Sequence, residues 1–249
     1  MFAQGYHAER GEKVPKGNEP ESIYAVMSGT HSNATCCFDY GNSENTRTAR
    51  YPQDYHAGSM EAIYFGSGQW LGRNKGSGSG PWVGADMEGG YYYGGGNATR
   101  VNQASKPLPH EFVSLSLKGR SDGFTLRGGD ATQGPLETMY DGPRPDCRLA
   151  GTCTSNTSYQ PMTKQGAITL GAGGDFSYPH AIGTFYEGFL AVGSVPDATD
   201  AAIQSNIVAV GYKTLKADDD QATLGSLPNK PECLGDVVQA ALSRTAPSC

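Results

Sequence analysis

The chain has 249 residues, 37% of them hydrophobic, and a formal net charge of −6 at pH 7. No window approaches the roughly 18 apolar residues that a membrane-spanning helix needs, so we expect no membrane association. The 19 lysines and arginines form no basic cluster, which argues against a nucleic-acid-binding protein.

Short alternating or apolar runs predict β-strands along most of the chain, because Gly, Asn, Pro and Ser gather between them. In chain order the runs are Ile23–Met27, Glu61–Phe65, Trp82–Glu88, Phe112–Lys118, Gly123–Arg127, Ala167–Gly171 and Thr184–Val192. This spacing is typical of an antiparallel β-sandwich and not of alternating strand and helix units. The 35 glycines and 14 tyrosines also suit short strands joined by tight turns.

Two segments near the C-terminus have helical patterns. Pro196–Tyr212 begins with a proline suited to a first turn and repeats Ile203, Ile207 and Val210 at helical spacing. Asp236–Arg244 begins with a capping aspartate, and the polar, proline-bearing residues before it indicate a linker. We therefore expect a globular domain over residues 1–213, followed by a linker and a helical tail over residues 214–249.

Six cysteines allow several disulfide connectivities. Cys233 and Cys249 flank the second helix, and Cys147 and Cys153 bracket a short loop, so either pair could close locally. Cys36 and Cys37 are then left, side by side in a polar loop that runs into a strand. A bond between them would be a strained ring, because adjacent Cα atoms lie about 3.8 Å apart, below the usual disulfide range of about 4.4–6.8 Å. Reduced thiols, or a bridge to another loop, are the alternatives.

Glycosylation acceptor tripeptides occur at Asn33, Asn97 and Asn156, in turn-like surroundings. Together with the cysteines they favour a secreted, extracellular protein. Residues 1–20 contain no apolar core of a signal peptide, which conflicts with that expectation.

Two segments present acidic side chains beside glycine. In GPWVGADMEGG, a strand would place Val83, Ala85 and Met87 on a core face and the carboxylates of Asp86 and Glu88 together on the other, about 7 Å apart. The alternative is a solvated outer face that carries two ordinary surface acids.

The second segment, AITLGAGGDFSYPH, presents Asp175 at the tip of a glycine turn beside aromatic residues. Such a carboxyl group could stay protonated at neutral pH and act as a general acid, although aspartate is also a common turn residue. A carboxylate paired with a carboxylic acid is what glycoside hydrolysis requires.

The five histidines show no metal-ligand spacing, so we expect neither a metal site nor a cofactor. They are His7, His31, His56, His110 and His180.

Four segments together resemble the catalytic domain of fungal-type α-L-arabinofuranosidase B, glycoside hydrolase family 54. They are EPESIYAVMSGTHSNATCCFDYGNSE, HAGSMEAIYFG, GPWVGADMEGG and KQGAITLGAGGDFSYPHAIGTFYEGFLAVG, and the resemblance extends from about residue 1 to Tyr212. It implies a concanavalin-like β-sandwich, or jelly roll, that releases terminal arabinofuranosyl residues from plant cell-wall polysaccharides or oligosaccharides and retains anomeric configuration.

The resemblance also assigns roles to residues. Glu88 would be the nucleophile and Asp175 the general acid/base, with their carboxyl groups about 5–5.5 Å apart as retention requires. The substrate-binding residues implied are Asp86, Trp70, the Gly174 backbone and a Cys36–Cys37 vicinal disulfide beneath the sugar.

Three departures from the family pattern leave alternatives open. Gly89-Gly90 stands where the family has Asn-Asn, so hydrogen bonds to the sugar are expected to change. The resemblance begins part-way into the family's catalytic domain, which leaves open an incomplete sandwich with exposed strand edges. The family's arabinose-binding module is replaced by the short tail. A catalytically impaired sandwich that binds arabinose, or a nonfunctional fragment, are the other readings.

Overall fold

The computed structural model describes residues 5–9, 11–45, 57–69, 75–94, 101–146, 158–174 and 180–215. The chain divides by its internal contacts into two compact units, Met1–Val210 and Gly211–Cys249. The domain boundary expected after residue 213 remains a prediction, and the helix expected at Asp236–Arg244 lies outside the described residues. No described helix has the length and apolar character needed to cross a bilayer.

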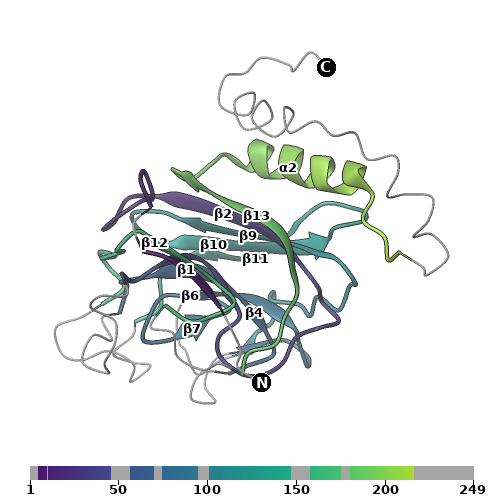
Figure 1. Cartoon of the computed structure of the whole chain (residues 1–249), viewed down its shortest axis with the longest axis horizontal. Coiled ribbons are helices and arrows are strands. Elements are labelled where there is room, and N and C mark those ends of the chain that lie inside the picture. Colours follow the sequence, from purple (N-terminus) through teal and green to yellow (C-terminus); the bar gives the residue numbers. More distant parts are fainter. Residues whose placement is uncertain are drawn as a thin grey trace, which may run out of the picture. The chain divides into compact units, whose positions relative to one another are not determined.

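The first unit is built from two stacked antiparallel sheets (Figure 1). The six-stranded sheet has the order β1-β12-β3-β4-β6-β7, and its strands are Tyr6–Ala8, Ala167–Leu170, Asp39–Ser43, Glu61–Gly66, Trp82–Asp86 and Tyr91–Tyr92. The five-stranded sheet has the order β11-β10-β9-β2-β13, with strands Glu137–Gly142, Phe124–Asp130, Val113–Gly119, Glu21–Met27 and Phe185–Val192. A short parallel pair joins β5, Lys75–Gly76, to β8, Val101–Asn102. The all-β sandwich expected from the sequence is therefore confirmed.

The hydrophobic core lies between the two sheets and follows the alternation of each strand. From the five-stranded sheet it receives Ile23, Ala25, Met27, Val113, Leu115, Leu117, Phe124 and Leu126, and from the other sheet Ile63, Phe65, Val83, Ala85 and Met87. Alternate side chains point to opposite faces of a strand, so the intervening residues lie on the outer faces. The core face predicted for Val83, Ala85 and Met87 is correct.

The predicted strands all form, but one ends early. We expected a strand over Trp82–Glu88, whereas β6 ends at Asp86 and the chain turns at Glu88. The separation of about 7 Å along one strand is therefore wrong for these two acids. Strands β1, β5, β7, β8 and β11 were not predicted, because most are very short and β11 contains Glu, Asp and Gly, which strands disfavour.

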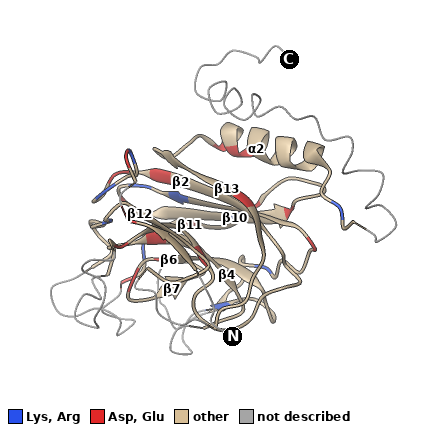
Figure 2. Cartoon of the chain, in the orientation of Figure 1, with Lys and Arg blue, Asp and Glu red and all other residues tan. Residues whose placement is uncertain are grey.

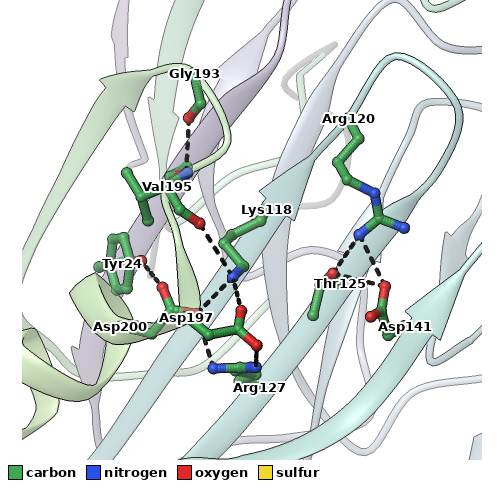
Figure 3. Close-up of polar contacts among 11 residues, drawn as sticks. Tyr24, Lys118, Arg120, Thr125, Arg127, Asp141, Gly193, Val195, Asp197 and Asp200 are labelled. Atoms are coloured by element: carbon green, nitrogen blue, oxygen red, sulfur yellow. Dashed lines mark hydrogen bonds and ion pairs between the residues drawn. The ribbon is translucent and has the colours of Figure 1, made fainter.

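Helix α2, Asp197–Val210, confirms the first predicted helix and is held on the outer face of the five-stranded sheet by charged side chains (Figure 3). The buried carboxylate of Asp200 contacts Lys118 Nζ at 2.6 Å and Arg127 Nη1 at 2.9 Å, and also accepts a hydrogen bond from the Tyr24 hydroxyl. Asp197 contacts the same two cations, each at 2.7 Å. The helix therefore docks by ion pairs as well as by Ile207, whereas Val210 of the predicted apolar face is 61% exposed.

A second set of charges, which we call the buried charge cluster, lies between the sheets and consists of Glu21, Glu61, Arg144 and Lys164. Lys164 Nζ lies 3.1 Å from a carboxylate oxygen of both Glu21 and Glu61, and Arg144 Nη2 lies 3.0 Å from the other oxygen of Glu61. Glu21 begins β2 and Glu61 begins β4, so the cluster joins the two layers. Figure 2 shows acidic residues on β2 and in α2 among the charges of the described chain.

The two carboxyl groups of the buried charge cluster have pKa values that are shifted in opposite directions. Burial, and then repulsion from Glu61, raise the pKa of Glu21 from its ordinary 4.5 to about 8, against the opposing effects of Lys164 and Asn42. Burial alone would also raise the pKa of Glu61, but Lys164 and Arg144 outweigh it and lower that pKa. Glu21 is therefore largely protonated at neutral pH, and Glu61 is ionised.

We expect Glu21 to make folding less favourable as the pH rises. Below about pH 4.5 Glu21 is protonated in both the folded and the unfolded chain. Between about pH 4.5 and pH 8 the unfolded chain loses this proton and the folded chain keeps it, so the free energy of unfolding falls as the pH rises through this interval. Urea unfolding across this interval should show a smaller loss of stability for Glu21→Gln than for the wild type. An identical pH dependence in both proteins would contradict the assignment.

The five-stranded sheet has an apolar edge in the described part of the chain. β13 is its last strand, and the side chains of Tyr186, Phe189 and Val192 are 40%, 41% and 64% exposed. The exposed strand edges expected of an incomplete sandwich remain a prediction.

Candidate active site

The structure joins Cys36 and Cys37 by a disulfide bond. Cys37 is buried in an aromatic cluster with Tyr64, Trp82, Tyr91 and Tyr93, and Cys36 packs against the same cluster. The two sulfurs therefore form a compact, polarisable surface beside aromatic rings. Cys147, Cys153, Cys233 and Cys249 lie outside the described residues, so their pairing remains a prediction.

The carboxylate of Asp86 lies beside this disulfide. One of its oxygens and the two sulfurs all lie within 4.8 Å of one another, and Asp86 is 5% exposed. A cysteine binds a metal as a thiolate, and these two sulfurs are instead bonded to each other. The three residues therefore suit an uncharged polar ligand, with the Asp86 carboxylate as hydrogen-bond acceptor and the disulfide as apolar surface. The alternative of a solvated outer face for Asp86 is therefore wrong.

Glu88 is buried next to Asp86 in an unusual backbone conformation. Its φ of 54° falls in the left-handed region, which non-glycine residues rarely occupy and which tends to occur at functional sites. Its backbone N–H donates to Oδ1 of Asp86 at 3.0 Å, so the aspartate fixes the turn that follows β6. The side chain is 6% exposed, which excludes an ordinary surface acid.

The glycine turn after β12 reaches Glu88 from a distant part of the sequence. The Gly171 N–H donates to the Asp39 carbonyl at 2.8 Å, and a Cβ atom at Gly174 would lie 3.5 Å from Glu88 Oε2 and 2.9 Å from Met60 Sδ. A side chain at Gly174 would therefore crowd Met60, and the glycine lets the backbone approach the carboxylate. Asp175 and Trp70 lie outside the described residues, so the separation of the two proposed catalytic carboxyl groups remains a prediction.

Four neighbouring strands and their connecting segments bring these parts together. The strands β12, β3, β4 and β6 are neighbours in the six-stranded sheet, but their register puts the end of β12 and the start of β3 at the end of the sheet opposite to the one where β6 ends. The connecting segments that carry Cys36, Cys37 and Gly174 therefore bring these residues to Asp86 and Glu88. The structure thus unites Cys36, Cys37, Asp86, Glu88 and Gly174 of the sequence-predicted site.

The aromatic cluster is a part of the site that the sequence analysis missed. Tyr64 and Tyr91 stack with ring centroids 4.1 Å apart, and Tyr93 and Trp82 meet edge to face at 5.2 Å. The Tyr93 hydroxyl donates to the Gly68 carbonyl at 2.6 Å, and Tyr64 accepts from the Gly68 N–H at 3.1 Å. Burial raises the pKa of Tyr64 to about 12, so its hydroxyl keeps its proton at neutral pH. The run of three tyrosines directly after the DMEGG motif was the available signal.

The backbone conformation explains why glycine occupies positions 89 and 90. Both residues have positive φ, 75° and 155°, and a Cβ atom at Gly90 would lie 2.9 Å from the Tyr92 hydroxyl. Tyr92 is held in place because its hydroxyl lies 3.1 Å from that of Tyr159. Gly90 therefore leaves room for a tyrosine that is part of the core.

Comparison with known proteins matches most of the chain to one protein family. Residues 2–213 match the family described as "Alpha-L-arabinofuranosidase B, catalytic". The chain is 42% identical over 208 residues to a probable alpha-L-arabinofuranosidase B of Aspergillus terreus, covering 84% of this chain and 37% of that protein. It is also 42% identical to an alpha-L-arabinofuranosidase of Hypocrea jecorina, covering 89% of this chain and 41% of that protein.

Solved structures give the same result. A crystal structure of an arabinofuranosidase complexed with arabinofuranosyl-alpha-1,2-xylobiose superimposes with a TM-score of 0.75 at 39% identity, covering 86% of this chain and 41% of that chain. A GH54 arabinofuranosidase soaked with a cyclic sulfate inhibitor gives a TM-score of 0.74. The chain thus spans about 40% of the length of the relatives it matches.

Proposed function

The chain belongs to the alpha-L-arabinofuranosidase B catalytic family, glycoside hydrolase family 54, and from this we propose that it is a retaining α-L-arabinofuranosidase. The substrates proposed are terminal arabinofuranosyl side chains of plant cell-wall polysaccharides or oligosaccharides, cleaved outside the cell. The observation that supports the activity best is the meeting of Glu88 with the Gly174 turn beside Asp86 and the cysteine pair.

The resemblance to the family gives each group a role. The Glu88 carboxylate attacks the anomeric carbon and forms a glycosyl ester, while the Asp175 carboxyl group protonates the departing oxygen. Asp175 then removes a proton from the water that hydrolyses the ester, so the anomeric configuration is retained. Asp86 accepts hydrogen bonds from sugar hydroxyls, and the Gly174 backbone lets the sugar lie close to Glu88.

The cysteine pair supplies the apolar side of the proposed pocket. A disulfide offers no competing hydrogen bonds, so it suits the carbon face of a furanose ring. We expect the double variant Cys36→Ser/Cys37→Ser to raise KM for an aryl arabinofuranoside roughly tenfold, which corresponds to a loss of about 1.4 kcal/mol in binding. Steady-state kinetics measure this, with circular dichroism as a check on folding. An unchanged KM in a folded variant would remove the disulfide from the pocket.

The activity is tested by incubating the purified chain with 4-nitrophenyl α-L-arabinofuranoside and following the first-formed sugar by proton NMR. The proposal predicts release of arabinose with the α configuration before mutarotation. Release of the β anomer would contradict retention. Binding of arabinose in calorimetry without hydrolysis would instead support a carbohydrate-binding sandwich.

A further inference from the structure

The proposed sugar-binding surface has two parts that come from different segments of the chain. Asp86 ends β6 and lies directly opposite Tyr91 of β7 in the antiparallel pair. The cysteine pair belongs to the loop before β3. An oxygen of Asp86 and the two sulfurs lie within 4.8 Å of one another, so the surface exists only while this loop keeps its place beside the β6–β7 pair.

Tyr93, just after β7, links these two parts. Its hydroxyl donates to the Gly68 carbonyl at 2.6 Å, and its ring belongs to the aromatic cluster that encloses Cys37. Burial raises the pKa of Tyr93 well above its ordinary value, so the hydroxyl keeps the proton that it donates. The Tyr64 hydroxyl accepts from the Gly68 N–H at 3.1 Å, so both backbone polar groups of Gly68 are bound to tyrosine hydroxyls.

Gly68 in turn packs against the loop that leads to the cysteine pair. A Cβ atom at Gly68 would lie 2.7 Å from the Ala34 carbonyl oxygen and 2.5 Å from the Tyr91 hydroxyl, so a larger residue would displace one of them. The Ser67 N–H donates to the Asn33 carbonyl at 3.0 Å and adds a second attachment. The segment after β4 is therefore held by the tyrosines on one side and contacts the residues just before the cysteines on the other.

We propose that Tyr93 is a positioning residue for sugar binding, because its hydrogen bond to Gly68 keeps the disulfide beside Asp86. The inference rests on the proposed function. The hydroxyl carries this role, since a phenylalanine would keep the edge-to-face contact of the ring with Trp82, whose centroid lies 5.2 Å away. Loss of the hydrogen bond should loosen the loop and weaken substrate binding, while the turn that carries the nucleophile keeps its own hydrogen bond.

The test compares Tyr93→Phe and the double variant Tyr64→Phe/Tyr93→Phe with the wild type in steady-state kinetics on 4-nitrophenyl α-L-arabinofuranoside. We expect KM to rise roughly threefold to tenfold in Tyr93→Phe, as the loss of one buried hydrogen bond allows, and further in the double variant. The value of kcat should stay within about twofold, because the reacting carboxylate is untouched.

A second measurement follows the disulfide and does not depend on activity. A phosphine reduces the disulfide and becomes a phosphine oxide with the oxygen of one water, while the two sulfurs take up two electrons and two protons. Iodoacetamide then labels the released thiols, and mass spectrometry of the peptide that carries Cys36 and Cys37 gives the rate. We expect reduction to be roughly threefold faster or more in Tyr93→Phe, because the loop opens more often.

Tyr24→Phe is the matched control, because it removes another buried tyrosine hydroxyl, which donates to Asp200 at the five-stranded sheet. This variant should lose stability but keep the wild-type KM and reduction rate. An unchanged KM and reduction rate in a folded Tyr93→Phe variant, or equal changes in Tyr24→Phe, would overturn the proposal. A wild type that releases no arabinose would refute the proposed function itself, whereas the reduction rates would still test the link between Tyr93 and the disulfide.

Discussion

Replacing Glu88 with Gln is expected to lower kcat for 4-nitrophenyl α-L-arabinofuranoside by roughly a thousandfold or more, with little change in the folded structure. The amide has the size of the carboxylate but cannot form the glycosyl ester, so both chemical steps of the retaining pathway fail. The substitution leaves the hydrogen bond from the Glu88 backbone N–H to Asp86 Oδ1 unchanged, so the turn should persist. Steady-state kinetics and a thermal unfolding curve measure the two properties.

Glu187→Gln is the control for the Glu88 substitution. Glu187 lies on the exposed strand β13, so the same chemical change there should leave kcat near the wild-type value. Activity near wild type in a folded Glu88→Gln variant would show that another carboxylate is the nucleophile.

Replacing Lys164 with Met is expected to destabilise the protein by about 3–5 kcal/mol, because it leaves two buried carboxyl groups without their shared cation. Lys164 Nζ contacts both Glu21 and Glu61 and donates to the Glu19 carbonyl at 2.6 Å. Arg144 would remain with Glu61 and limit the loss. Urea unfolding measures the difference in free energy.

Lys106→Met is the matched control for the Lys164 substitution. Lys106 pairs with Glu137 at 2.6 Å, but the two side chains are 61% and 56% exposed. Exposed ion pairs contribute at most about 1 kcal/mol, so this variant should unfold nearly as the wild type does. Equal effects of the two substitutions would show that the buried charge cluster does not hold the two sheets together.

Much of the fold follows from local patterns, because alternation in a half-buried strand is set by the strand itself. Val83, Ala85 and Met87 show this, since their spacing predicted the core face that they occupy. The left-handed turn at Glu88 could not be predicted in this way, because glutamate has no preference for that conformation. It depends on a hydrogen bond to Asp86 in the folded chain.

Interactions between distant residues were the main source of error. Helix α2 was predicted from apolar spacing, yet its docking depends on Asp200, whose partners Tyr24, Lys118 and Arg127 come from three different strands. Partners in the buried charge cluster are likewise far apart in the sequence, and no local pattern predicts them. Asn33 shows the same limit, since its side-chain hydrogen bond to the His180 carbonyl joins residues far apart in the sequence.

The identity of the nucleophile is tested most directly by labelling the chain with a mechanism-based arabinofuranosyl electrophile, such as a cyclic sulfate, and mapping the modified peptide by mass spectrometry. A retaining enzyme of the proposed design should carry one sugar, bound as an ester to Glu88, with activity lost in proportion to labelling. A label on Asp86 or on another carboxylate, with Glu88 unmodified, would contradict the proposed mechanism.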